Sequence, residues 1–83
     1  MKLRARQFNP THYVNTEDGL KLLVMLAYSQ KHQEKVVYSQ YMTKDDKPQG
    51  AVVESRLREG YNDALYFQRN RAKYYLVWLK PLR

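Results

Sequence analysis

The sequence predicts a single α+β domain in which a helical part, residues 15–63, is followed by a β-hairpin, residues 64–80. Three observations predict this fold class. A capping residue and two acids stand before a long apolar run, a segment opens with proline and ends with glycine, and two aromatic runs flank a short polar turn near the end of the chain. The 83 residues are enough for one domain, with residues 1–14 as a basic N-terminal arm or strand.

The first helix is expected to begin at Thr16, because threonine caps helices and Glu17 and Asp18 suit a first turn. It would run to about His32. Its residues from Leu20 to Tyr28 are apolar on nearly every side, and a helix of that kind has to be covered on every side. Because one small domain can hardly do this, the pattern predicts a homodimer.

Residues 35–63 allow two interpretations. In the first, a short strand at 36–38 leads into a short helix at 40–44, and Pro48 opens a second helix that ends at Gly60. In the second, residues 36–42 and 51–57 are two strands, since valine, tyrosine and threonine suit strands as well. The second interpretation gives one N-terminal helix packed on a small antiparallel sheet or barrel. The first is preferred because residues 54–59 alternate poorly as a strand.

The C-terminal part is expected to be a β-hairpin with a basic tip. Residues 64–68 and 74–79 are rich in aromatic and β-branched side chains, and residues 70–73 lie between them. Pro81 is expected to end the second strand.

This order of elements resembles the winged helix-turn-helix superfamily. The resemblance rests on the segments Tyr38 to Met42, Pro48 to Gly60, and Ala64 to Phe67 with Tyr74 to Trp78. It implies that helix 49–60 lies in the major groove of DNA and contacts bases, that the hairpin tip contacts phosphates as a wing, and that the N-terminal arm also contacts phosphate. The residues implied are Gln49, Ser55 and Arg58 on the helix, Arg69, Arg71 and Lys73 on the hairpin, and Lys2, Arg4 and Arg6 on the arm.

The charge distribution is the main indication of function. The net charge is +7, and residues 1–16 and 64–83 contain basic residues and no acid. Such segments attract phosphate backbones. They favour a nucleic-acid-binding protein, with duplex DNA as the first expected partner and a small transcription regulator of a phage or plasmid as the expected role.

Two other partners fit the same charges. One is an acidic protein, which would make the chain an interaction module or an inhibitor of a nucleic-acid-processing enzyme. The other is single-stranded nucleic acid bound by a small β-rich barrel, on which Tyr66, Tyr74, Tyr75 and Trp78 would stack against bases.

The sequence offers no pattern for catalysis or for a cofactor. His12 and His32 are isolated, there is no glycine-rich phosphate loop, and there is no cysteine. The longest apolar run, Leu22 to Tyr28, is too short to cross a membrane. We therefore expect a cytoplasmic protein that is not an enzyme and that needs neither metal nor cofactor.

Overall fold

A computed structural model describes residues 8–83, and this part of the chain consists of antiparallel β-sheet with no α-helix. Within residues 8–83, two short 3-10 segments interrupt the strands, η2 (Tyr61–Asp63) and η3 (Leu76–Trp78). The prediction of an α+β winged helix-turn-helix fold is therefore wrong, and so is the N-terminal helix of the alternative. The domain is all-β.

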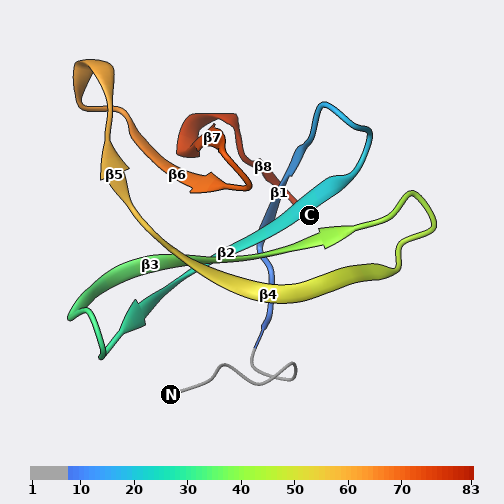
Figure 1. Ribbon diagram of the computed structural model, residues 1–83, viewed down its shortest axis with the longest axis horizontal. Helices are drawn as coiled ribbons and strands as arrows, with labels where there is room; N and C mark the ends of the chain where they lie inside the picture. The colour runs from blue at the N-terminus through green and yellow to red at the C-terminus, as the bar shows by residue number, and fades with distance from the viewer. Residues whose placement is uncertain (1–7) are drawn as a thin grey trace.

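The larger sheet has five strands in the order β4-β3-β2-β1-β8. Its long strands are β2 (Lys21–Ser29), β3 (Glu34–Met42) and β4 (Pro48–Arg56), which form a meander across the lower half of the view (Figure 1). The short strand β1 (His12–Asn15) pairs with β2 on one side and with β8 (Lys80–Pro81) on the other. The β1–β8 pair joins the beginning and the end of the described chain.

The smaller sheet has three strands in the order β5-β6-β7 and lies above β3 and β4 in the same view (Figure 1). The strands are β5 (Arg58–Glu59), β6 (Leu65–Arg69) and β7 (Ala72–Tyr75). Only Leu57 separates β4 from β5, so the chain bends there and passes from one sheet to the other. The half-buried Leu57 side chain packs against the core at this bend.

One core lies between the two sheets. The large sheet contributes Val14, Leu22, Val24 and Val37, and the small sheet contributes Phe67 and Tyr74. Phe67 is fully buried, and its ring is stacked on Tyr74 with 5.5 Å between the centroids. The small sheet is thus held to the large one mainly by the inward side chains of β6 and β7.

Residues 17–32 form a turn, strand β2 and the start of the following turn, and the first half of the apolar run is buried in the sheet. Leu22, Leu23 and Val24 are consecutive and all buried, as expected of a strand with cover on each side. Gly19 has a φ of +85°, a left-handed conformation that an α-helix cannot accommodate in its first turns. The first part of the apolar run that predicted a homodimer is therefore buried within one chain, whereas Leu26 and Tyr28 are 38% and 61% exposed. The dimer itself stays a prediction.

Residues 36–42 and 51–57 follow the second interpretation, as parts of β3 and β4. Pro48 is the first residue of β4 and pairs with Met42. A bulge shifts the register between Ser39 and Tyr41, beside Gly50 with its φ of +80°. The bulge interrupts the alternation of β4 near Gly50. Residues 54–59, whose poor alternation favoured a helix, comprise the end of β4, the bend at Leu57 and β5, so they are not one continuous strand.

Strands β6 and β7 form a hairpin in the expected region but with different bounds, since the turn is residues 70–71 and not 70–73, and the second strand is Ala72–Tyr75 and not 74–79. Arg69 pairs with Ala72 across a two-residue turn of Asn70 and Arg71. The strand ends at Tyr75, and residues 76–78 form η3 instead of continuing it. Pro81 lies inside the short strand β8 and does not end a strand begun at Tyr74.

Candidate nucleic-acid interface

The outward face of the small sheet carries an unusual concentration of aromatic and basic side chains. Tyr66 is opposite both Arg58 and Tyr75, and Gln68 is opposite Lys73. Because side chains alternate along a strand, these residues point away from the face that buries Phe67 and Tyr74. We name this surface the aromatic face, and it consists of Arg58, Tyr66, Gln68, Lys73, Tyr75 and the adjoining Trp78.

The rings of the aromatic face support one another. The centroids of Tyr66 and Tyr75 are 5.3 Å apart, and those of Tyr75 and Trp78 are 5.0 Å apart in an edge-on arrangement. Aromatic pairs at such separations contribute about 0.5–1.5 kcal/mol beyond their buried area. Trp78 nevertheless keeps 52% of its surface exposed. A flat ligand can therefore stack on an indole that its neighbours already hold in place.

Basic groups lie directly beside these rings. The Lys73 Nζ atom is 5.0 Å from the centroid of Tyr66, a cation–π contact. Arg58 is exposed on the neighbouring strand, and residues 64–83 contain no acid. Glu59 is the next residue after Arg58 and so projects to the other side of β5. The face thus combines stacking surface with positive charge.

A groove of about 730 Å³ adjoins the aromatic face at Lys73 and Trp78. It runs between the β1–β2 loop and the β6–β7 hairpin, with parts of β3 and β4 below. Besides Val14, Thr16, Leu20 and Ala72, its lining has four kinds of side chain. These are the rings of Tyr41, Tyr74 and Trp78, the cations Arg69, Arg71 and Lys73, the amides Asn15, Gln49 and Asn70, and the carboxylates Glu17 and Asp18.

The hairpin wall of the groove is fixed by its turn. Asn70 and Arg71 have φ values of 50° and 67°, so both central residues are left-handed. Two-residue turns with this property match the twist of the flanking strands, and asparagine tolerates the conformation well. The Asn70 Nδ2 atom donates a hydrogen bond of 2.8 Å to the Tyr41 hydroxyl, which attaches the tip to β3.

The opposite wall is a compact loop organised by Thr16. The backbone N–H of Thr16 donates to the Leu20 carbonyl at 2.9 Å, and the Leu20 N–H donates to the Thr16 hydroxyl oxygen at 3.0 Å. The same hydroxyl donates to the Asp18 carboxylate. Thr16 therefore caps a turn between two strands, where the sequence predicted that it would cap a helix. The loop holds Glu17 and Asp18 at the groove.

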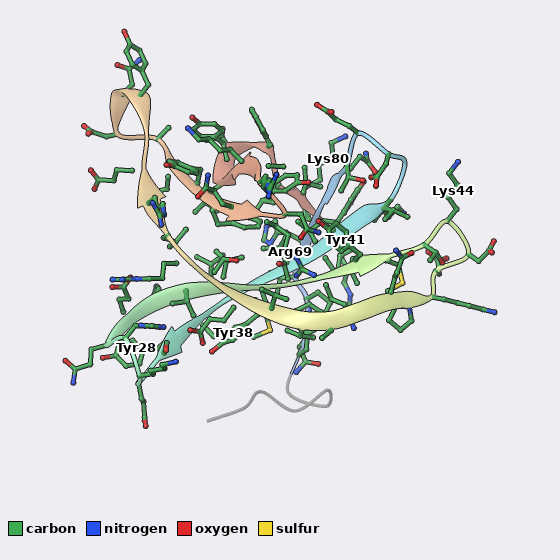
Figure 2. All side chains as sticks on the ribbon, in the orientation of Figure 1. Tyr28, Tyr38, Tyr41, Lys44, Arg69 and Lys80 are labelled. Atoms are coloured by element: carbon green, nitrogen blue, oxygen red, sulfur yellow. The ribbon has the colours of Figure 1, made fainter. Side chains whose placement is uncertain are left out.

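Arg69 supports the groove from inside the domain. Only 8% of its surface is exposed, and its Nη1 atom donates to the carbonyl and hydroxyl oxygens of Ser39 at 2.8 and 3.1 Å. Its guanidinium also lies 4.6 Å from the Tyr41 ring centroid, and both side chains occupy the space between the sheets (Figure 2). The arginine satisfies the buried Ser39 and joins the two sheets.

The electrostatics of the groove differ between its walls. Burial raises the pKa of the Tyr74 hydroxyl, neighbouring Tyr41 and the carboxylates of Asp18 and Glu17 raise it further, and Arg69 opposes them. The effect of the two carboxylates on Tyr74 indicates a negative potential on the β1–β2 side. Arg71 and Lys73 make the hairpin side positive.

The structure brings together some of the predicted site residues and separates others. Gln49 lies in the groove with Arg69, Arg71 and Lys73, whereas Ser55 and Arg58 line a second, smaller groove of about 420 Å³ that Arg69 also lines. Ser55 donates a hydrogen bond of 3.1 Å to the Gln68 carbonyl. Residues 49–60 lie mostly in β4 and β5, so the prediction of a recognition helix there is wrong. Gln49, Ser55 and Arg58 therefore do not share one face of a helix. Lys2, Arg4 and Arg6 lie outside the described residues.

Several groove residues were not predicted from the sequence. Glu17 and Asp18 were assigned to a helix start, and Asn15, Tyr41 and Asn70 were not considered. Asn70 carried a local signal, since asparagine in a short turn between two aromatic runs is typical of a hairpin. The other residues are far from the hairpin in sequence, and only the closure of the two sheets places them beside it.

Comparison of the chain with protein-family models, with curated proteins and with solved structures finds no match. The functional argument therefore rests on the geometry of the chain itself.

Two further observations concern residues 8–83 alone. They contain no group of three or more histidine, cysteine, aspartate or glutamate side chains arranged to hold a metal ion. Within the same residues, no helix has the length and apolar character needed to span a membrane.

Proposed function

We propose that the protein binds single-stranded nucleic acid across the aromatic face and into the adjoining groove. The observation that carries the proposal is the outward row of Tyr66, Tyr75 and Trp78 with Lys73 and Arg58 beside it. Proteins that bind single strands combine aromatic side chains, on which bases stack, with basic groups that follow the backbone.

A single strand is favoured over a duplex by the shape of this surface. In a duplex the base faces are stacked on one another and cannot reach the exposed indole of Trp78. In a single strand they are free to do so. The predicted entry of a helix into the major groove has no counterpart in an all-β domain.

The protein supplies its own reporter for the test, because Trp78 is its only tryptophan. We expect the emission of Trp78 to be quenched when oligonucleotides of about eight nucleotides are added, a length within the range bound by small β-domains. Fluorescence anisotropy of labelled single strands and of a matched duplex gives the affinities. We expect the single strands to bind more tightly.

The variant Trp78→Ala should weaken single-strand binding by about 5- to 150-fold, the equivalent of about 1–3 kcal/mol for one stacked base. The matched control is Tyr28→Ala, which removes an aromatic side chain that is 61% exposed at the far end of the large sheet (Figure 2). It should leave the affinity unchanged. Equal loss in the two variants, or equal binding of duplex and single strand, would contradict stacking at this face.

Salt dependence tests the basic part of the interface. Each phosphate contact contributes roughly −0.7 to the slope of log K against log salt for single strands. The variant Lys73→Gln should therefore reduce the slope by about that amount. If no oligonucleotide binds at low salt, the proposal fails and the predicted acidic protein partner becomes the better explanation of the basic surface.

A further inference from the structure

The groove beside the aromatic face has walls of opposite charge, which a purely phosphate-binding cleft would not have. Arg71 and Lys73 lie on the hairpin wall, and Glu17 and Asp18 lie on the β1–β2 loop. Phosphates are attracted to the first wall and repelled by the second. A ligand that matches both has an anionic group at one end and hydrogen-bond donors at the other.

A nucleotide of the bound strand has this shape when its base enters the groove. The phosphate would stay near Arg71 and Lys73, and the base would stack on Trp78 at the rim that the groove shares with the aromatic face. The edge of the base would then reach the loop that carries the carboxylates. An ionised carboxylate can only accept hydrogen bonds, so it selects a base edge that donates them.

Guanine matches this requirement best among the four bases. Its pairing edge presents two adjacent donors, N1–H and the 2-amino group, which one carboxylate can accept together with its two oxygens. Cytosine and adenine present one amino group beside an acceptor nitrogen. Thymine and uracil present one N–H between two carbonyl oxygens, which a carboxylate repels.

Glu17 is better placed than Asp18 to make this contact. The Asp18 carboxylate already accepts the hydrogen bond of the Thr16 hydroxyl, which organises the loop. Glu17 is exposed on the same turn, and its longer side chain has greater reach. The guanine O6 atom needs a donor, and the side-chain amide of Gln49 lines the same groove.

We infer that the groove reads one unpaired guanine of the bound strand, with Glu17 accepting hydrogen bonds from its pairing edge and Trp78 stacking on its ring. This inference rests on the proposed function, because it names the base that the same interface prefers.

The experiment compares three single-stranded oligonucleotides that differ at one position. The first is an all-thymine strand, the second has one central guanine, and the third has inosine at that position. Inosine keeps the N1–H, the O6 atom and the ring system of guanine but lacks the 2-amino group. Trp78 quenching and anisotropy measure binding to the unmodified protein and to its variants.

For the unmodified protein we expect guanine to be preferred over thymine by about 5- to 150-fold, the range of one good bidentate base contact, with inosine between them. In Glu17→Gln the preference for guanine over inosine should fall to about unity, while binding of the all-thymine strand is retained. The matched control is Glu59→Gln, which makes the same charge change at an exposed residue of β5 that does not line the groove. It should keep the preference.

The possible results separate this inference from the proposed function. Failure of every oligonucleotide to bind overturns both. Binding of all three strands with equal affinity overturns the guanine inference and leaves single-strand binding in place. Equal effects of Glu17→Gln and Glu59→Gln on the preference would mean that general charge is responsible, and they also overturn the role of Glu17. Circular dichroism of both variants shows that the fold is retained.

Discussion

The large sheet completely buries Leu22, Val24, Val36 and Val37, whereas Phe67 is the hydrophobic side chain that the small sheet buries completely. The small sheet instead turns Tyr66 and Tyr75 outward and carries Trp78 beside them. The comparison shows a division of tasks. The large sheet supplies most of the burial that stabilises the domain, and the small sheet is held in place by a few inward residues that leave its other face free for binding.

The largest expected effect comes from removing the single large anchor of the small sheet. Phe67→Ala should lower the free energy of unfolding by about 3–5 kcal/mol, the usual cost of emptying a buried phenylalanine site. Because both sheets share one core, we expect one cooperative transition in urea. Far-UV circular dichroism reports mainly on the long strands, and Trp78 emission reports on the small sheet.

Two separate unfolding transitions would contradict a shared core, because the small sheet would then unfold independently of the large sheet. The control is Val77→Ala, at a residue that is 83% exposed in η3. It should change stability by less than about 0.5 kcal/mol.

A smaller loss is expected when the polar connection between the sheets is removed. Arg69→Met keeps the apolar stem but takes away the hydrogen bonds to the Ser39 carbonyl and hydroxyl. Leaving such buried groups without their donor costs about 1–3 kcal/mol. The measurement is urea unfolding of the single variant.

A double-mutant cycle with Ser39→Ala sharpens this result. The two losses should be clearly less than additive, because each change removes part of the same contact. Full additivity would show that Arg69 stabilises the domain through the Tyr41 ring and not through Ser39.

The smallest expected effect is a loss of folding stability at alkaline pH. It is tested on one tyrosine from each region, Tyr74 on the small sheet and Tyr38 on the large sheet. The pKa of Tyr74 is raised mainly by burial between the sheets, and that of Tyr38 is raised by weaker burial together with its hydrogen bond to Glu54. Because the folded-state pKa of each tyrosine lies above its unfolded value, the folded state favours the neutral hydroxyl. The contribution of each tyrosine to stability is therefore fully present below about pH 10, and it is lost as the pH rises through the folded-state pKa.

Each phenylalanine variant, Tyr74→Phe and Tyr38→Phe, should therefore lose less stability between neutral and alkaline pH than the unmodified protein. The effect should be larger for Tyr74, of which only 8% is exposed. Thermal unfolding as a function of pH measures it, and a larger effect for Tyr38 would reverse the assigned order of burial.

The hairpin was predictable from sequence because its signals are local. Two aromatic runs around a short polar segment depend on neighbours along the chain, although the observed turn is two residues long and not the four residues 70–73 that were expected. The segment 16–32 was not predictable in this way. Thr16 accepts a backbone hydrogen bond in the turn, but from Leu20, four residues on, and not from the second or third residue as a helix cap does. Leu, Met and Ala in β2 favour a helix in isolation, and only the pairing with β1 and β3 makes the segment a strand.

The candidate site was only partly predictable. Arg71, Lys73 and Gln49 were selected for their charge or hydrogen-bonding capacity, and they do lie at one groove. Arg69 was selected for its charge as well, but it is buried against Ser39, because an inward position on β6 faces a polar side chain of β3. Nothing near Glu17 in the sequence indicates that it lies across from the hairpin.

The β1–β8 pair has a consequence for the order of events in folding. The β2–β3–β4 meander joins neighbouring segments, whereas His12 pairs with Pro81 across almost the whole chain. Contacts between distant segments carry a larger loop-closure cost, so we expect the meander to dominate the transition state and the β1–β8 pair to form after it. The groove has one wall on the β1–β2 loop and the other on the hairpin, so it is completed when the small sheet packs on the large one, a step that follows the meander. A ligand held there would therefore slow the unfolding rate of the domain and leave its folding rate almost unchanged.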